Sequence, residues 1–145
     1  MLRIGVCDNV KACVEEVAAG IEGWALIRNM NVQIMKFGSG EEILFDLENA
    51  GDFAAVFMDI ELSGINGLET AARIRKQNRL VSIVFVSGQK RYFNQMFEIF
   101  PFQYIEKPAK KPKVYEVLDH ILEEQRFLYE SFSFRYNRKT FNICL

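Results

Sequence analysis

The chain has 145 residues, a formal net charge of −1, and a composition that is 50% hydrophobic and 26% charged. This length suits one folded domain with a short remainder, and the composition argues against intrinsic disorder. The near-neutral charge provides no whole-chain case for a nucleic-acid or acidic partner.

The first half of the chain alternates between short apolar runs and segments with helical spacing. Residues 2–7 are mostly apolar and too short for a typical helix, so they predict a buried strand. Over residues 10–24 apolar side chains recur every three or four positions, which predicts a helix. Residues 32–37 predict a second strand, and residues 39–48 predict a second helix.

The alternation continues after residue 50. Residues 53–58 are wholly apolar and predict a third strand, and a glycine-containing loop then leads to a helix around residues 68–74. Residues 81–86 are rich in β-branched and aromatic side chains and predict a fourth strand.

Large apolar side chains then mark a fourth helix over residues 92–97, which ends before Pro101. We expect these side chains to be mostly core, although so many aromatics would also suit a dimer surface. Residues 102–106 predict a fifth strand. The last helix has apolar positions over residues 114–122, and we expect it to end between there and Leu128.

Strands that are apolar throughout are buried on both faces, and the intervening helices cover those faces. The sequence therefore predicts a doubly wound α/β fold. Its sheet is expected to have five parallel strands in the flavodoxin-like order 2-1-3-4-5, with helices on both faces.

The end of the chain has a different pattern. After about Arg126 the helical spacing gives way to an alternating segment at residues 132–136, which predicts a strand, and residues 137–139 predict a turn. We therefore divide the chain into one domain over residues 1–125 and a further segment over residues 126–145.

Polar residues follow four of the predicted strands. Asp8 and Asn9 follow the first strand, Asp59 the third, Ser87 the fourth and Lys107 the fifth. Ligands of an open parallel sheet bind beyond the carboxyl ends of the strands, at the crevice where the strand order reverses. We therefore expect Asp8 to face Asp59 across that crevice.

These residue types suit phosphoryl transfer. Carboxylates, an amide oxygen and a loop carbonyl are hard oxygen ligands of the kind that Mg²⁺ prefers. A carboxylate beside such a cation stays ionised and can attack phosphorus. Ser87 would donate a hydrogen bond to the phosphoryl oxygens, and Lys107 would supply positive charge. The expected acceptor of the phosphoryl group is Asp59.

Five short motifs resemble those of the receiver domains of bacterial two-component response regulators. Their order and intervals over residues 2–125 also resemble that family, which implies a phosphorylation switch. The motifs are Cys7-Asp8-Asn9, Met58-Asp59-Ile60-Glu61, Gly64-Ile65-Asn66-Gly67-Leu68-Glu69, Val86-Ser87-Gly88 and Tyr104-Ile105-Glu106-Lys107-Pro108.

The resemblance implies a role for each site residue. It also implies a sensor histidine kinase as the partner, and a switch that at most catalyses its own phosphorylation and dephosphorylation. The residues are Asp59 as the phosphoacceptor; Asp8, Asn9, Asp59 and the backbone carbonyl of Glu61 as the Mg²⁺ site; and Ser87, Tyr104 and Lys107 as the switch residues.

The turn at residues 38–44 and the stretch 100–104 also resemble receivers that precede LytTR-type DNA-binding domains. We interpret residues 126–145 as the linker and truncated start of such a domain, and expect DNA contact only through its missing part. Receivers of this kind can form homodimers through the fourth helix, the fifth strand and the last helix. We expect the same surface to serve here.

The cysteines and the absence of targeting segments suggest a location. Cys7, Cys13 and Cys144 are odd in number and form no CxxC pair, so neither a disulfide framework nor a zinc site is expected. No signal peptide or membrane span is recognisable. We expect a cytoplasmic protein without a membrane contact.

Two departures from the family pattern leave alternatives open. Asn9 stands where a second carboxylate is usual, which predicts weaker Mg²⁺ binding, and Ser63 stands where proline is usual. Asn9 is equally suited to capping the first helix. One alternative function is a phosphorylation-independent pseudo-receiver. The other is a small flavodoxin-like enzyme or cofactor binder, although no glycine follows the first strand to cradle a phosphate.

Overall fold

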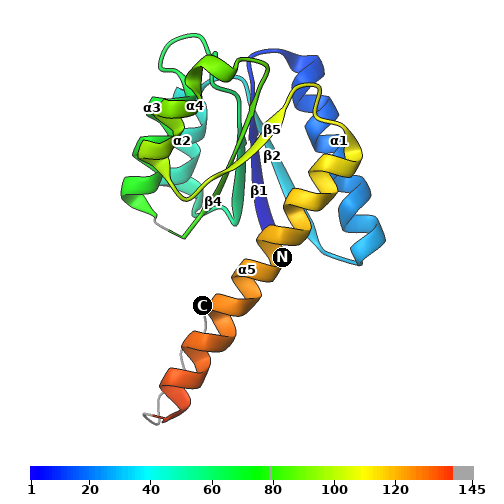
Figure 1. Cartoon of the computed structure of the whole chain (residues 1–145), viewed down its shortest axis with the longest axis vertical. Helices are drawn as coiled ribbons and strands as arrows, with labels where there is room; N and C mark the ends of the chain where they lie inside the picture. The colour runs from blue at the N-terminus through cyan, green and yellow to red at the C-terminus, as the bar shows by residue number, and fades with distance from the viewer. Residues whose placement is uncertain (79, 139–145) are drawn as a thin grey trace.

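The computed structural model describes residues 1–78 and 80–138, with side-chain burial and contacts up to residue 125. Its centre is a five-stranded sheet in which all neighbouring strands are parallel (Figure 1). The order β2-β1-β3-β4-β5 confirms the predicted topology. The strands are β1 (Leu2–Cys7), β2 (Val32–Phe37), β3 (Ala55–Met58), β4 (Ser82–Ser87) and β5 (Gln103–Glu106).

Helices cover both faces of the sheet, as expected for parallel strands that are buried on both sides. In Figure 1, α1 and α5 lie on one face, and α2, α3 and α4 lie on the other. The helices are α1 (Lys11–Arg28), α2 (Gly40–Ala50), α3 (Gly67–Gln77), α4 (Phe93–Met96) and α5 (Lys111–Arg138); the 3-10 turns η1 (Lys90–Tyr92) and η2 (Phe97–Ile99) flank α4.

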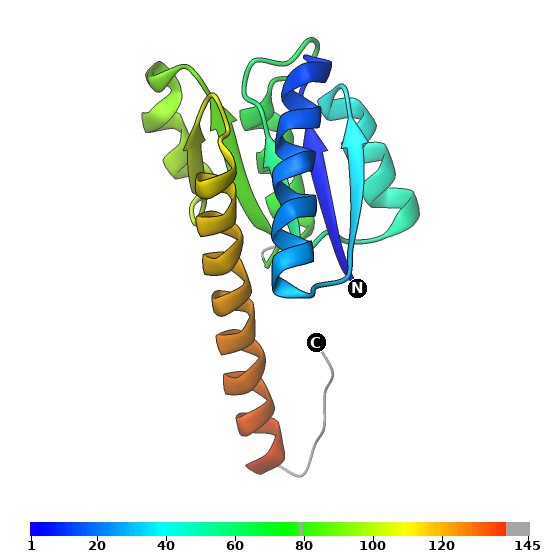
Figure 2. The ribbon, with the colours of Figure 1, turned by 90° about the vertical axis from the view of Figure 1, so that its right-hand side faces the viewer.

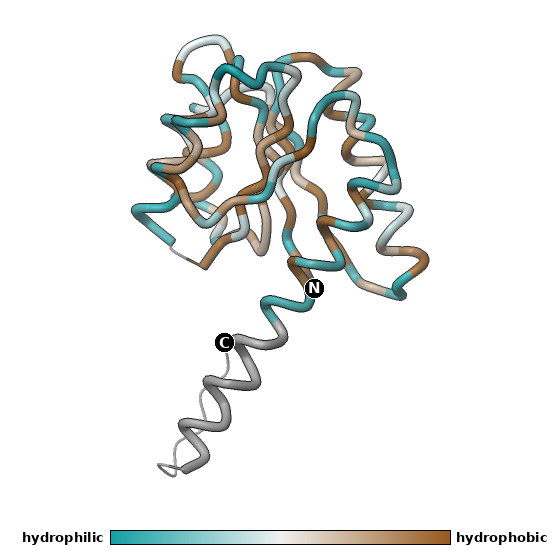
Figure 3. Tube along the Cα trace, viewed as in Figure 1, coloured by the Kyte–Doolittle hydropathy of each residue, from teal (hydrophilic) through white to brown (hydrophobic). Residues whose placement is uncertain are grey.

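The two covered faces form two separate cores. One core lies beneath α1 and α5 and includes Trp24, Phe57 and Ile105. The other lies beneath α2, α3 and α4 and includes Met58 and Phe85. Because Phe57 and Met58 are consecutive residues of β3, their side chains point to opposite faces. β3 is buried at every position and β4 at all but its first, and Figure 3 shows hydrophobic residues along the central strands.

Local capping explains where two helices begin. Ser39 precedes α2 and its hydroxyl accepts a hydrogen bond from the Glu42 amide at 3.2 Å. Asn66 precedes α3 and accepts from the Glu69 amide at 2.9 Å. Each cap satisfies an amide that has no partner within its own helix. Both helices therefore begin next to the loops at the carboxyl end of the sheet.

The fourth helix is shorter than predicted. Only four residues, Phe93–Met96, are α-helical, between two 3-10 turns. Met96 is fully buried, but Phe93 and Phe97 are 42% and 54% exposed, so the expectation that they are core is wrong. These two rings pack edge to face on each other, with centroids 5.4 Å apart. Their further ring contacts are with Phe102 and Tyr104, at the edge of the sheet formed by β5.

The last helix is longer than predicted. It runs to Arg138 and projects well beyond the sheet (Figure 2), so the strand expected at residues 132–136 is wrong. Neither proline nor glycine occurs between residues 113 and 138, and adding a residue to an existing helix carries no nucleation cost. The boundary predicted at residue 125 therefore falls inside α5, while residues 139–145 lie outside the described part of the chain.

Candidate functional site

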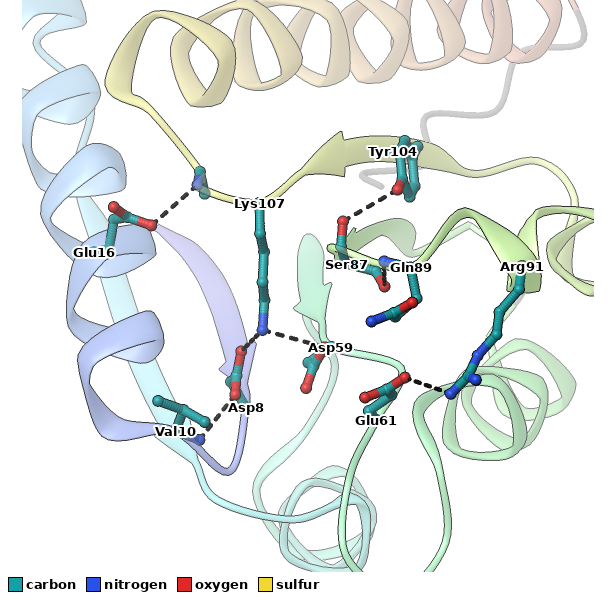
Figure 4. A network of polar contacts seen from close by, with 11 residues as sticks. Asp8, Val10, Glu16, Asp59, Glu61, Ser87, Gln89, Arg91, Tyr104 and Lys107 are labelled. Carbon is teal, nitrogen blue, oxygen red and sulfur yellow. Dashed lines mark hydrogen bonds and ion pairs between the residues drawn. The ribbon is translucent and has the colours of Figure 1, made fainter.

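Asp8 and Asp59 lie side by side at the carboxyl end of the sheet (Figure 4). β1 pairs with β3 so that Cys7 is level with Met58, and each aspartate is the next residue of its chain segment. The Asp59 N–H donates to the Cys7 carbonyl at 2.9 Å and extends this register by one residue. Both aspartates are only 5% exposed. The topology therefore brings together two buried carboxylates that are far apart in sequence.

Lys107 joins the two carboxylates from the end of β5. Its Nζ lies 2.8 Å from Asp8 Oδ2 and 3.3 Å from Asp59 Oδ1. Removing one partner of a buried ion pair leaves an uncompensated charge, which is far more costly than losing an exposed pair. Lys107 is therefore the positive charge that the two buried carboxylates share.

The charges of the site shift the pKa values of its members. Burial raises the pKa of Asp59, the negative charge of Asp8 raises it further, and Lys107 opposes both effects. For Lys107, burial lowers the pKa, but the hydrogen bond to Asp8 and the charges of both aspartates outweigh burial, so its pKa is raised. Two carboxylates and one ammonium leave a net negative charge, which favours binding of a cation.

The oxygen donors fit a hard cation, although with few charges. The Glu61 carboxylate pairs with Arg91, at 2.9 Å from Nη2, so this side chain is engaged in an ion pair of its own. Asn9 is exposed beside Asp8. Among the described residues, no group of three or more His, Cys, Asp or Glu side chains gathers around a common point. The two carboxylates are hard oxygen donors of the kind that Mg²⁺ prefers, and an amide (Asn9) and a backbone carbonyl (Glu61) are the further donor types on the adjoining residues.

The suggestion that Asn9 caps the first helix is wrong. The residue at the N-cap of α1 is Val10, and no side chain caps the helix. Instead, Asp8 Oδ1 accepts a hydrogen bond from the Val10 amide at 2.8 Å. Asp8 is therefore the residue that accepts from this amide, and Asn9 lies exposed beside it.

Ser87 connects the site to β5. Its hydroxyl is buried and accepts a hydrogen bond from the Gln89 amide at 3.0 Å. Its backbone carbonyl accepts from the Lys107 amide and from the Tyr104 hydroxyl, both at 3.1 Å. Burial, followed by the charge of Glu106, raises the pKa of Tyr104, so this hydroxyl keeps its proton and remains a donor. The three predicted switch residues are thus joined through one carbonyl.

Two residues that contact the site loops, Arg91 and Glu16, were not found from the sequence, and Gly67 was named there only as part of a motif. Arg91 pairs with Glu61, and its guanidinium also lies 4.9 Å from the centre of the Tyr92 ring. Glu16 of α1 accepts a hydrogen bond from the Ala109 amide at 3.0 Å. Gly67 lies so close to the loop after β3 that an added Cβ would be 1.9 Å from the Asp59 carbonyl oxygen.

Comparisons with known proteins agree with this geometry. A profile of the response regulator receiver domain family matches residues 5–119. The chain is 26% identical over 133 residues to the sensory transduction protein LytT of Bacillus subtilis (strain 168), covering 90% of this chain and 52% of that protein. It is 31% identical over 120 residues to LytT of Bacillus anthracis, and the match covers 81% of this chain and 46% of that protein. The chain thus spans about half the length of the curated relatives it matches.

Solved structures share the fold. A CheY-like response regulator receiver domain protein of Methanospirillum hungatei JF-1 superposes with a TM-score of 0.73 at 22% identity, covering 87% of this chain and 97% of that one. The BeF3-activated DrrB receiver domain superposes with a TM-score of 0.72 at 20% identity, and the match covers 85% of this chain and 98% of that one. In the described part of the chain, no helix has the length and apolar character needed to cross a membrane.

The family match covers most of the chain and the five motifs that form the carboxyl end of the sheet. It therefore excludes the flavodoxin-like enzyme or cofactor binder as the best interpretation. The order of strands and the placement of the paired aspartates point the same way. The chain belongs to the response regulator receiver domain family, whose members are signalling switches with a phosphoacceptor role.

Proposed function

We propose that this receiver accepts a phosphoryl group on Asp59 from a sensor histidine kinase. Response regulators are phosphorylated by such kinases, and receiver domains generally bind Mg²⁺ at the phosphorylation site. The observation that carries the proposal is the pairing of two buried aspartates with one lysine at the carboxyl end of the sheet. Asp8, Asn9, Asp59 and the Glu61 carbonyl would hold Mg²⁺, which supplies positive charge against the phosphoryl oxygens when bound.

Asp59, Lys107 and Ser87 each have a separate role in the proposed transfer. An oxygen of the Asp59 carboxylate attacks phosphorus and forms a P–O bond, while the P–N bond of phosphohistidine breaks and its electron pair returns to the imidazole. Lys107 then has a phosphoryl group as an additional acceptor besides Asp8. The Ser87 hydroxyl already accepts from the Gln89 amide, so its own proton is available to a phosphoryl oxygen.

We propose that the signal passes from Ser87 to an aromatic surface. We use this name for Phe93, Phe97, Phe100, Phe102 and Tyr104, whose rings lie edge to face with centroids 5.4 to 6.4 Å apart. Tyr104 links this surface to Ser87 through its hydroxyl. Since Phe97 and Phe100 are 54% and 66% exposed, the surface is suited to contact a second copy through α4, β5 and α5, or an output domain.

The output that we propose is transcriptional. The relatives named LytT extend well beyond the matched region, and residues 126–145 would lead into a LytTR-type DNA-binding domain. We also propose the cytoplasm as the location, which agrees with the free thiols of Cys7 and Cys13. In the proposed role, the protein is a switch that at most catalyses its own phosphorylation and dephosphorylation. A pseudo-receiver has less support, because both aspartates and the lysine are present.

The test is labelling with acetyl phosphate in the presence and absence of Mg²⁺, followed by intact mass. The proposal predicts a gain of one phosphoryl group that needs Mg²⁺ and disappears in Asp59→Asn. No gain in the wild-type chain at any Mg²⁺ concentration would support the pseudo-receiver. An equal gain in Asp59→Asn would show that another residue is the acceptor.

A further inference from the structure

The loop between β5 and α5 carries Lys107 and is tied to the rest of the fold at two points. On one side, the Lys107 amide donates to the Ser87 carbonyl of β4 at 3.1 Å. On the other side, the Ala109 amide donates to Glu16 Oε1 of α1 at 3.0 Å. The residue that reaches both aspartates is therefore held from a strand and from a helix.

The second tie is the stronger constraint. Ala109 is only 1% exposed, so its amide has little access to water and depends on Glu16 for a hydrogen bond. A buried N–H without an acceptor is destabilising, and a bond to a charged acceptor is stronger than one to a neutral acceptor. Without Glu16, the loop would have to move to satisfy this amide.

Glu16 also completes a closed chain of contacts around the site. α1 begins three residues after Asp8, and Asp8 Oδ1 binds the Val10 amide at the start of that helix. Further along, α1 holds Ala109 through Glu16, and Lys107 returns to Asp8 with an Nζ to Oδ2 distance of 2.8 Å. The two ends of the lysine–aspartate bridge are thus anchored on one rigid helix.

We propose that Glu16 is a positioning residue for Lys107. The carboxylate of Glu16 fixes the loop so that the ammonium of Lys107 reaches Asp8 and Asp59 together. This inference rests on the proposed function of the site, because it concerns how that site is held. Glu16 itself touches neither aspartate, so its effect is transmitted through the loop.

The neighbouring Glu15 provides a matched control. It lies on the same helix and is also exposed, but its carboxylate pairs with Lys36 of β2 at 3.1 Å on the surface. Exposed pairs of this kind contribute little to stability. Replacing Glu15 changes the net charge as replacing Glu16 does, but it leaves the loop of Lys107 untouched.

The experiment compares Glu16→Ala, Glu16→Asp, Glu16→Gln and Glu15→Ala in the whole chain. We measure the rate of labelling by acetyl phosphate with saturating Mg²⁺, and the NMR signals of the Ala109 amide and the Lys107 side chain. Glu16→Ala should shift both signals and slow labelling about ten-fold, the effect of roughly 1.4 kcal/mol on a barrier. Glu16→Asp, which keeps the charge on a shorter side chain, should act in the same direction.

Glu16→Gln keeps an acceptor oxygen at the same length, so it should recover most of the rate, and Glu15→Ala should match the wild type. Wild-type labelling and unchanged Lys107 signals in both Glu16→Ala and Glu16→Asp would overturn the inference. So would a Glu16→Gln variant as slow as Glu16→Ala. If the wild-type chain takes up no phosphoryl group, the proposed function fails, while the Lys107 signals still decide whether Glu16 positions the lysine.

Discussion

The ammonium of Lys107 and the carboxylate of Asp8 join residues 99 positions apart in the sequence, with an Nζ to Oδ2 distance of 2.8 Å. This contact spans the sheet from the end of β5 to the end of β1, and Asp59, which directly follows the intervening β3, lies 3.3 Å from the same Nζ. The site is therefore a set of three interacting charges, and changing any one of them should alter both stability and cation binding.

Lys107→Met should lower the free energy of unfolding by about 2 kcal/mol in the absence of divalent cations, because it leaves two buried carboxylates without their shared partner. Mg²⁺ should restore much of the loss, since a cation that binds only the folded state stabilises it. Urea denaturation with EDTA and with Mg²⁺ measures both effects. The control is Lys110→Met, which removes an exposed lysine of the same loop. A loss that Mg²⁺ leaves unchanged would contradict this account.

Asn9→Asp should tighten Mg²⁺ binding roughly ten-fold, because cation sites gain affinity with the number of charged ligands. Asn9 is exposed next to Asp8, so the new carboxylate would add charge without new burial. Titration calorimetry measures the affinity of the wild type, Asn9→Asp and Asn9→Ala. If Asn9→Ala binds Mg²⁺ as well as the wild type, the amide is not a ligand. If Asn9→Asp also shows no gain, residue 9 lies outside the cation site.

Positions at strand ends explain why so much of the site was predictable. Once the alternation of strands and helices predicts a parallel sheet, topology alone places Asp8, Asp59, Ser87 and Lys107 at one edge. The same logic says nothing about Glu16, because its contact with the loop depends on how α1 is rotated and how far a side chain reaches.

The length of helices was less predictable than their order. Burial against the sheet explains the apolar spacing of α5 up to Ile121, but the helix continues to Arg138 where that spacing has ended. For α4 the error was the opposite one, because the helix is shorter than predicted. Its apolar spacing suggested a full helix, yet Phe93 and Phe97 contact other aromatic rings at the surface. Apolar periodicity therefore indicates that a helix is present, but it gives neither the length of the helix nor the contacts of its apolar side chains.

Gly67→Ala should destabilise the chain by about 3 kcal/mol, because its Cβ would lie 1.9 Å from the Asp59 carbonyl oxygen and 2.8 Å from Ile60 Cα. Both atoms belong to the backbone, so relief requires α3 to move away from the site loop. Helix propensity alone would make this substitution stabilising, so a loss of stability would point to the close contact. Gly88→Ala is the control, since its nearest contact is Lys107 Cβ at 4.0 Å. Equal urea midpoints for the two variants would refute the prediction.

Arg75→Lys should destabilise the connection between α3 and the segment before β5 by about 1–3 kcal/mol. The guanidinium donates to the carbonyls of Val81 at 2.6 Å and Pro101 at 2.7 Å, and one ammonium cannot reproduce this fork. Its burial also lowers the pKa of Arg75, as expected for a cation removed from water. Hydrogen exchange should accelerate at residues 97–101. Arg73→Lys alters only an exposed pair with Glu69 and should change neither exchange nor stability.

Asp119 should make stability depend on pH through its contacts with α1. Its Oδ1 accepts from Trp24 Nε1 and Arg28 Nε, both at 2.9 Å, and its Oδ2 accepts from Arg28 Nη2 at 2.8 Å. The bond from Arg28, and then that from Trp24, lowers the pKa of Asp119. A lowered pKa means that the unfolded chain takes up the proton first, so this stabilisation is present above about pH 4 and is lost as the pH falls below that value.

Asp119→Asn removes this titration while keeping the size of the side chain. The wild type should be more stable than the variant at neutral pH, and the difference should shrink as the pH falls through and below 4. Urea denaturation read by the fluorescence of Trp24, the single tryptophan, measures the difference at each pH. The control is Glu116→Gln, which also removes one carboxylate of the same helix but at an exposed position paired with Lys113. A constant difference for Asp119→Asn would mean that its contacts with Arg28 and Trp24 contribute no pH-dependent stability.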